Sequence, residues 1–174
     1  MPVPTDLERL YQEHRQGLFT LALAITRNEH RAEDAVHEAF VRMFRREGRG
    51  MNDPAAYAYS AVRNAAIDQV RRDSRRKDKQ GSIFDVGETS GIESKSSNGE
   101  AGPVDTALDN EKRAAVVKAL DQLSEAQRDV IVMKIYGQLT FDQIGEALGE
   151  QLSTVASRYR RGLGRLKDEL RKWQ

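Results

Sequence analysis

Cysteine is absent from this chain of 174 residues, and aromatic side chains make up only 6% of it. The absence of cysteine excludes disulfide bonds, thiolate zinc sites and cysteine nucleophiles, and it fits a reducing compartment. No stretch approaches the roughly 18 consecutive apolar residues of a membrane-spanning helix. Asp6 and Glu8 lie where a secretory signal would be basic and then apolar. We therefore expect a cytoplasmic protein with no membrane insertion.

An excess of charge of one sign is also lacking, since 28 basic and 27 acidic residues give a formal net charge of +1. The basic residues are nevertheless concentrated near the C-terminus, where residues 157–172 contain only Asp168 and Glu169 as acids. Such a basic cluster is compatible with nucleic-acid binding. The basic residues of this cluster are Arg158, Arg160, Arg161, Arg165, Lys167, Arg171 and Lys172.

Sustained period-two alternation, the pattern of a half-buried strand, is missing, whereas apolar residues recur at helical spacing. The sequence therefore predicts an all-α protein. A first helix begins near Thr5, which has capping-box spacing to a glutamate, and runs to about Arg27. A second helix ends near Arg46. Asp53 followed by Pro54 predicts the start of a third helix, with an oxygen acceptor at the cap and proline at the first helical position.

The composition divides the chain into two small helical domains joined by a flexible linker. Glycine, serine and scattered charges replace the helical pattern between residues 76 and 110. Such a composition is typical of a flexible tether. We expect a first domain at residues 1–75, the linker at 76–110, and a second domain at 111–174.

The second domain contains several helix signals. Two capping boxes predict the starts of successive helices. Gly149 is suited to the left-handed position that ends the second of them, and we expect Ser153 to cap the last helix. The two boxes are Ser124 with Gln127 and Thr140 with Gln143.

The last two predicted helices, joined by a short glycine-containing turn, have the layout of a helix-turn-helix, whose second helix enters the DNA major groove. Residues near the start of that helix, including Arg160 and Arg161, are expected to face away from its apolar stripe and to reach DNA. The alternative is that the basic helix serves only solubility and the helix dipole. The stripe that we expect to face inward consists of Val155, Tyr159, Leu163, Leu166 and Leu170.

Two blocks of sequence resemble a known family. AEDAVHEAFVRMFR (32–45) and YAYSAVRNAAIDQVRR (57–72) resemble the second conserved region of extracytoplasmic-function sigma factors, members of the sigma-70 family. QRDVI (127–131), LTFDQIGEALG (139–149) and STVASRYRR (153–161) resemble their fourth region. The resemblance implies an alternative-type sigma factor, without enzymatic activity or cofactor, that binds core RNA polymerase, directs it to specific promoters and helps open the minus-ten region.

The resemblance also implies partners for the first domain. The second predicted helix would dock on the clamp helices of core polymerase through Asp34, His37, Glu38 and Phe40, although the family usually has glutamine where this chain has His37. Phe40 is also expected to belong partly to the core. The flap of the large polymerase subunits, promoter DNA and an anti-sigma factor are further implied partners. Because the chain ends soon after the last helix, we expect regulation to lie outside it.

The implied DNA contacts fall into two groups. At the minus-ten element a flipped base would be captured near the start of the third helix, and, since the only tryptophan is Trp173, base stacking would depend on Tyr57 or Tyr59. The alternative for Asn64 is a polar side chain on the solvated helix face. The minus-ten candidates are Tyr57, Tyr59, Arg63, Asn64, Arg71 and Arg72, and the minus-thirty-five candidates are Ser153, Thr154, Ala156, Ser157, Arg158, Arg160 and Arg161.

Two alternatives to a sigma factor remain open from the residues alone. Asp34, His37 and Glu38 share a helical face at a spacing that suits a metal ion, although one helix supplies few ligands. A self-contained transcription regulator is the stronger alternative, with a first domain that binds a ligand or dimerises. It would bind specific duplex DNA without polymerase.

Overall fold

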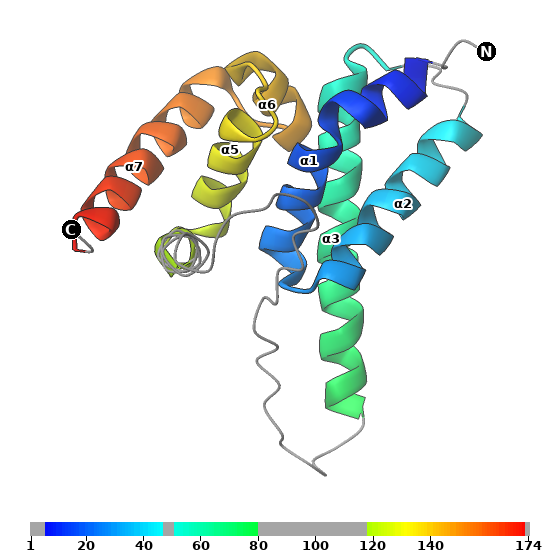
Figure 1. Cartoon of the computed structure of the whole chain (residues 1–174), viewed down its shortest axis with the longest axis horizontal. Helices are drawn as coiled ribbons and strands as arrows, with labels where there is room; N and C mark the ends of the chain where they lie inside the picture. Colours follow the sequence, from blue (N-terminus) through cyan, green and yellow to red (C-terminus); the bar gives the residue numbers. More distant parts are fainter. Residues whose placement is uncertain (1–5, 47–50, 80–117, 173–174) are drawn as a thin grey trace, which may run out of the picture.

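The computed structural model describes residues 6–46, 51–79 and 118–172, and its regular elements in these ranges are helices (Figure 1). This confirms the all-α prediction. None of the described helices is both long and apolar enough to cross a membrane. The elements are α1 (Asp6–Thr26), α2 (Glu29–Arg45) and α3 (Pro54–Lys79) in the N-terminal part, and α5 (Glu125–Ile135), α6 (Phe141–Leu148) and α7 (Leu152–Arg171) in the C-terminal part.

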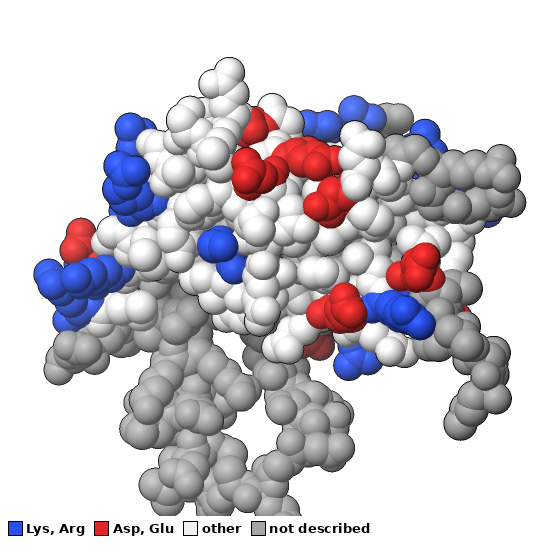
Figure 2. Space-filling view, turned by 90° about the horizontal axis from the view of Figure 1, so that it is seen from above, with Lys and Arg blue, Asp and Glu red and all other residues white. Residues whose placement is uncertain are grey.

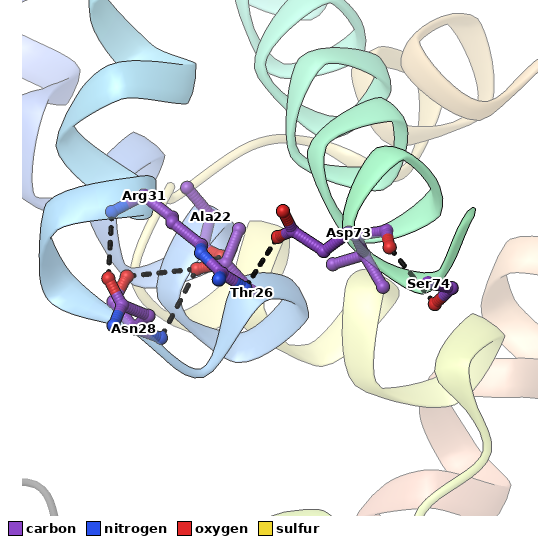
Figure 3. Close-up of polar contacts among 7 residues, drawn as sticks. Ala22, Thr26, Asn28, Arg31, Asp73 and Ser74 are labelled. Atoms are coloured by element: carbon purple, nitrogen blue, oxygen red, sulfur yellow. Dashed lines mark hydrogen bonds and ion pairs between the residues drawn. The ribbon is translucent and has the colours of Figure 1, made fainter. Parts of the chain in front are cut away.

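The turn between α1 and α2 is fixed by side chains that satisfy helix ends (Figure 3). Asn28 caps α2, where its Oδ1 accepts from the Arg31 backbone N–H at 3.0 Å. The Thr26 hydroxyl donates to the Ala22 carbonyl at 2.9 Å. Arg31 also forms an ion pair of 2.6 Å with Asp73. The α1–α2 turn is thereby held against the second half of α3.

Helix α3 begins where the sequence predicts. The Ala56 backbone N–H donates to Asp53 Oδ1 at 2.9 Å, which supplies the cap. The helix continues to Lys79 and so extends four residues into the range predicted as linker, 76–110. The remainder of that range, and the predicted Thr5 cap, lie outside the described residues.

Both predicted capping boxes of the C-terminal part are present, and Gly149 ends α6 in the left-handed conformation with a φ of 67°. The prediction that Ser153 caps the last helix is wrong. Helix α7 already begins at Leu152, after Gln151 at the N-cap, which makes no side-chain capping bond. Ser153 therefore lies inside the first turn and cannot be the cap.

The expected inward stripe of α7 is only partly correct. Val155 and Leu166 are buried, but Leu163 and Leu170 keep 43% and 37% of their exposure. The buried line passes through Gly162 instead, where a Cβ would lie 2.6 Å from a side chain of α5. Close approach of the two helices at this glycine turns Leu163 and Leu170 away from the contact.

The apolar core continues from the N-terminal part into the C-terminal part. Leu18 and Tyr59 belong to the same buried cluster as Leu139 and Ile144. Figure 1 shows α5 and α6 lying beside α1 and the upper half of α3, with α7 farther out. A second cluster joins α5 to α7 and consists of Ala119, Leu123, Ile131 and Leu166.

Candidate nucleic-acid interface

The first turns of α7 present the residues predicted to contact the minus-thirty-five duplex. Ser153, Arg160 and Arg161 are exposed, and the other candidates, Thr154, Ala156, Ser157 and Arg158, are half-buried. Arg158 forms an ion pair of 2.8 Å with Glu150 in the preceding turn. Figure 2 shows basic side chains gathered at the end of the molecule that α7 forms. The arrangement leaves Arg160 and Arg161 as the accessible cations nearest the helix N-terminus.

The orientation of α7 depends on contacts with α6. The left-handed Gly149 reverses the chain, and the Phe141 and Tyr159 rings pack at a centroid distance of 5.4 Å. Lys134 lies 5.1 Å from the centroid of Phe141, which continues the contact to α5. The helix-turn-helix layout predicted from the sequence is therefore present as α6 and α7 packed on α5.

The predicted minus-ten candidates lie along α3, but they are not equally accessible. Tyr57 is half-buried, and its hydroxyl accepts from Arg46 at 2.9 Å. Asn64 and Arg71 are exposed, and Arg72 is exposed near Glu38. The other two candidates are held by the C-terminal part, since Arg63 pairs with Asp129 and Tyr59 is completely buried.

A small cavity of about 160 Å³ lies beside the N-terminus of α3. Tyr57 lines it, together with Glu146 of α6. Burial raises the pKa of Asp53 in its wall, but hydrogen bonds from Ala56 and Gln143 lower that pKa more, so the net shift is downward. The ionised carboxylate is therefore stabilised at this helix start. The remaining residues of the wall are Met51, Asn52, Ala56 and Ser60.

The predicted polymerase-docking residues lie on α2. His37 is exposed, and Asp34 keeps 58% of its side-chain exposure, with His30 at 3.8 Å. Glu38 is bound between two arginines, Arg42 on the same helix and one of α3. Phe40 is buried, in agreement with the prediction that it belongs to the core.

An aromatic groove of about 1020 Å³ lies between α1 and α2, beside the docking candidates. The Tyr11 and Phe40 rings meet edge to face at a centroid distance of 5.0 Å. Phe44 remains 46% exposed. Sequence reasoning missed Tyr11, Phe19 and Phe44. Their signal was aromatic residues separated by multiples of four on each helix, which places them on one face.

The alternative metal site gains no support. Within the described residues, histidine and acidic side chains do not form a group of three that could hold a metal ion. Asp34 and Glu38 instead lie beside His30 and Arg42, respectively.

Comparison with known proteins gives the family. Residues 10–76 match the family model for sigma-70 region 2, and residues 119–168 match the model for sigma-70 region 4. A relative from Mycobacterium tuberculosis, the ECF RNA polymerase sigma factor SigL, is 33% identical over 155 residues, which cover 87% of this chain and 81% of SigL. The chain belongs to the extracytoplasmic-function sigma factors. These are alternative sigma factors that direct RNA polymerase to promoters, as the sequence predicts.

Other similar proteins are also ECF RNA polymerase sigma factors. The ECF RNA polymerase sigma factor SigE of Mycolicibacterium smegmatis is 29% identical over 95% of this chain, which spans 62% of that relative. SigK of Mycobacterium sp. strain KMS is 25% identical, with coverage of 91% of this chain and 80% of SigK.

Solved structures share the fold. The sigma factor RpoE in complex with the anti-sigma factor NepR from Bartonella quintana matches with a TM-score of 0.66 and 19% identity, covering 94% of each chain. CnrH in complex with the cytosolic domain of CnrY matches with a TM-score of 0.65 and 18% identity, covering 95% of this chain and 88% of CnrH.

Proposed function

We propose that this sigma factor docks on core RNA polymerase through α2, reads the minus-thirty-five duplex through α7 and captures a minus-ten base at the start of α3. The observation that carries the proposal is the separation of two accessible surfaces. On α2, His37 lines the aromatic groove and Asp34 is exposed on the same helix, whereas Arg160 and Arg161 are exposed on α7. One surface suits a protein with basic and apolar side chains, and the other suits duplex DNA.

Regulation by a protein partner forms part of the proposal. The two similar structures are complexes of RpoE with the anti-sigma factor NepR and of CnrH with CnrY. Their similarity in fold supports an anti-sigma factor as a partner of this chain. Because bacterial core polymerase and promoter DNA are cytoplasmic, the proposed function requires the chain to act in the cytoplasm.

Competition for core polymerase tests the docking surface. Asp34→Lys places a positive charge beside the groove and should weaken holoenzyme formation at least about tenfold, as expected when attraction at an interface becomes repulsion. Asp34 is a better choice than Glu38, whose reversal would place lysine against Arg42 and Arg72 and disturb α2 itself. Glu13→Lys, an exposed reversal on α1, is the matched control. Equal competition by both variants would contradict docking through α2.

A further inference from the structure

The C-terminal part is seated on the surface that the proposed function assigns to minus-ten capture. Helix α6 packs against α3, and α5 packs against α1 (Figure 1). Apolar side chains from both parts form one continuous cluster. We call this arrangement the closed conformation, and we call its polar contacts, centred on Arg63 with Asp129 and on Asp53 with Gln143, the interdomain clasp.

An ion pair joins α3 to α5 at the centre of the clasp. Arg63 Nε donates to Asp129 Oδ2 at 2.6 Å, and the Asp129 side chain retains only 4% of its exposure. Burial raises the pKa of Asp129 more than the hydrogen bond and charge of Arg63 lower it. Glu125 and Arg128 of α5 are the other charges that act on this carboxylate. The ionised carboxylate is therefore costly in the interface and depends on Arg63 for compensation.

The caps of two helices are joined in the same interface. Asp53 caps α3 through one carboxylate oxygen, and its other oxygen accepts from Gln143 Nε2 at 2.9 Å. Gln143 is itself part of the α6 capping box. Glu146, on the same helix, lines the cavity beside Tyr57. Helix α6 therefore covers the start of α3 and places a carboxylate there.

A close backbone contact completes the interface. A Cβ at Gly17 would lie 2.1 Å from the Tyr59 hydroxyl oxygen and 2.9 Å from the Gly137 Cα. Among the residues that the structure describes, the buried Tyr59 hydroxyl has no hydrogen-bond partner. Closure thus removes water from both this hydroxyl and the Asp129 carboxylate, and both removals oppose it. Apolar burial and the clasp must offset these costs, so loss of Arg63, which leaves the buried carboxylate uncompensated, favours separation.

We propose that the closed conformation is self-inhibited and that Arg63 is its release point, a proposal that rests on the proposed function for the role of α3. A nucleic-acid phosphate that binds Arg63 leaves Asp129 buried without its counter-charge. Departure of α5 and α6 then rehydrates the carboxylate. Arg63 cannot serve both partners at once, so binding of single-stranded DNA to α3 is coupled to opening.

The inhibition is selective for minus-ten capture. In the closed conformation, Asp34 and His37 on α2 are exposed, as are Arg160 and Arg161 on α7. Arg63 and Tyr59, by contrast, are held by α5 and by the turn that follows it. Polymerase docking and contact with duplex DNA can therefore precede opening, whereas strand capture cannot.

The distance between two spin labels tests the proposal on the full chain. Because the chain has no cysteine, Ser74→Cys on α3 and Lys167→Cys on α7 provide unique labelling sites. Arg63→Gln, Asp129→Asn and the double variant are compared with the otherwise unchanged labelled chain at neutral pH. Arg75→Gln, which changes an exposed arginine of α3, is the matched control. Circular dichroism verifies that each variant remains helical.

Arg63→Gln leaves the buried carboxylate unpaired, so the ratio of open to closed molecules should rise at least about tenfold. Asp129→Asn should remain closed. The double variant should return to the closed ratio, because a neutral amide pair needs no compensating charge. An Arg63→Gln chain as closed as the Arg75→Gln control, or a double variant as open as Arg63→Gln alone, overturns the proposal.

A single-stranded oligothymidylate tests release without altering Arg63, because stacking and phosphate contacts do not require a particular sequence. It should open the unchanged chain, and it should open Asp129→Asn at least about fivefold less readily, since the buried amide carries no charge. Equal opening of both overturns the proposal.

Core polymerase binding is measured on the same samples. If the chain opens as described but does not bind core polymerase, the proposed function is contradicted and the self-inhibition is not. If the chain binds core polymerase but does not open with the oligothymidylate, the self-inhibition is contradicted and the proposed function is not.

Discussion

Tyr59 is a core residue in the closed conformation and a predicted base-stacking residue, and its burial prevents the second role. Its ring fills the core beneath Gly17 and Gly137, while its hydroxyl finds no hydrogen-bond partner in the described part of the chain. Burial raises the pKa of this hydroxyl, which therefore remains protonated at any physiological pH. Base stacking by Tyr59 remains a prediction, and it requires α5 and α6 to move away first.

Removal of the Tyr59 hydroxyl should stabilise the protein. Tyr59→Phe keeps the packed ring and deletes the unpartnered polar atom, so the free energy of unfolding should rise by about 1 kcal/mol. Chemical denaturation followed by circular dichroism measures it. Tyr57→Phe is the control, because its hydroxyl accepts from Arg46 and its loss should not stabilise the protein. A loss of stability in Tyr59→Phe would show that the hydroxyl has a partner.

In the proposed function, helices α3 and α7 contact different promoter elements, so single changes on them should affect different steps. Arg161→Ala should weaken holoenzyme binding to duplex promoter by about 1 to 3 kcal/mol if the side chain reads a base. Arg165→Ala, an exposed change one turn farther from the helix start, should have the smaller effect. A gel-shift titration measures both. Similar losses for the two arginines would indicate general charge attraction rather than readout by the first turns.

Asn64→Ala on α3 should leave duplex binding unchanged and lower the yield of open complex, because its proposed partner is exposed only after strand separation. Permanganate reactivity of the melted region measures this yield. Rescue of the variant by a premelted template would support base capture. Normal transcription from duplex DNA would instead favour the interpretation that Asn64 is only a polar side chain on the solvated face of α3.

Helix starts that depend on neighbouring residues were predictable from the sequence. Asp53 with Pro54 and the Thr140 capping box are examples, because a cap is a contact within one turn. The burial pattern of α7 was less predictable. Leu163 and Leu170 fit an apolar stripe, but the close approach of α5 at Gly162 buries the helix face that carries Gly162 and Leu166 instead. Tertiary packing, which local spacing does not contain, decides that pattern.

At the scale of the whole molecule, the two helical domains and their family were predictable from sequence, but their packing against each other was not. Arg63 and Asp129 are 66 residues apart, and each appears in the sequence as an ordinary charge on a helix. Only the docking of α5 on the N-terminal part brings them together. The same docking buries Tyr59 and gives Gln143 a second partner, Asp53.

The clasp should respond to pH through Asp129. Because burial raises the pKa of Asp129, its carboxyl binds a proton more tightly in the closed conformation than in the open one. The protonated carboxyl therefore favours closure, and this contribution is lost as the pH rises through the raised pKa. In Arg63→Gln, the loss of the arginine removes a charge that lowers this pKa. The closed fraction of Arg63→Gln should therefore increase as the pH is lowered from about 7.5 to about 5.

The double variant Arg63→Gln/Asp129→Asn provides the control for this titration, measured with the same spin labels, since it lacks the titrating carboxylate. Asp53 does not produce the same response. Its pKa is lowered from the ordinary value of 3.8, so its contribution to closure is lost only below the pH range used. Equal pH responses of the single and double variants would show that another group controls closure.

Run-off transcription with purified core polymerase, on a duplex promoter from the operon of this chain, tests the central claim most directly. We expect a transcript with a single start that requires both the chain and core polymerase, because the proposed function divides promoter recognition between α3 and α7 and opening needs the holoenzyme. Specific, tight binding of the chain alone to that duplex, with no transcript on addition of core polymerase, would contradict a sigma factor and favour a self-contained regulator.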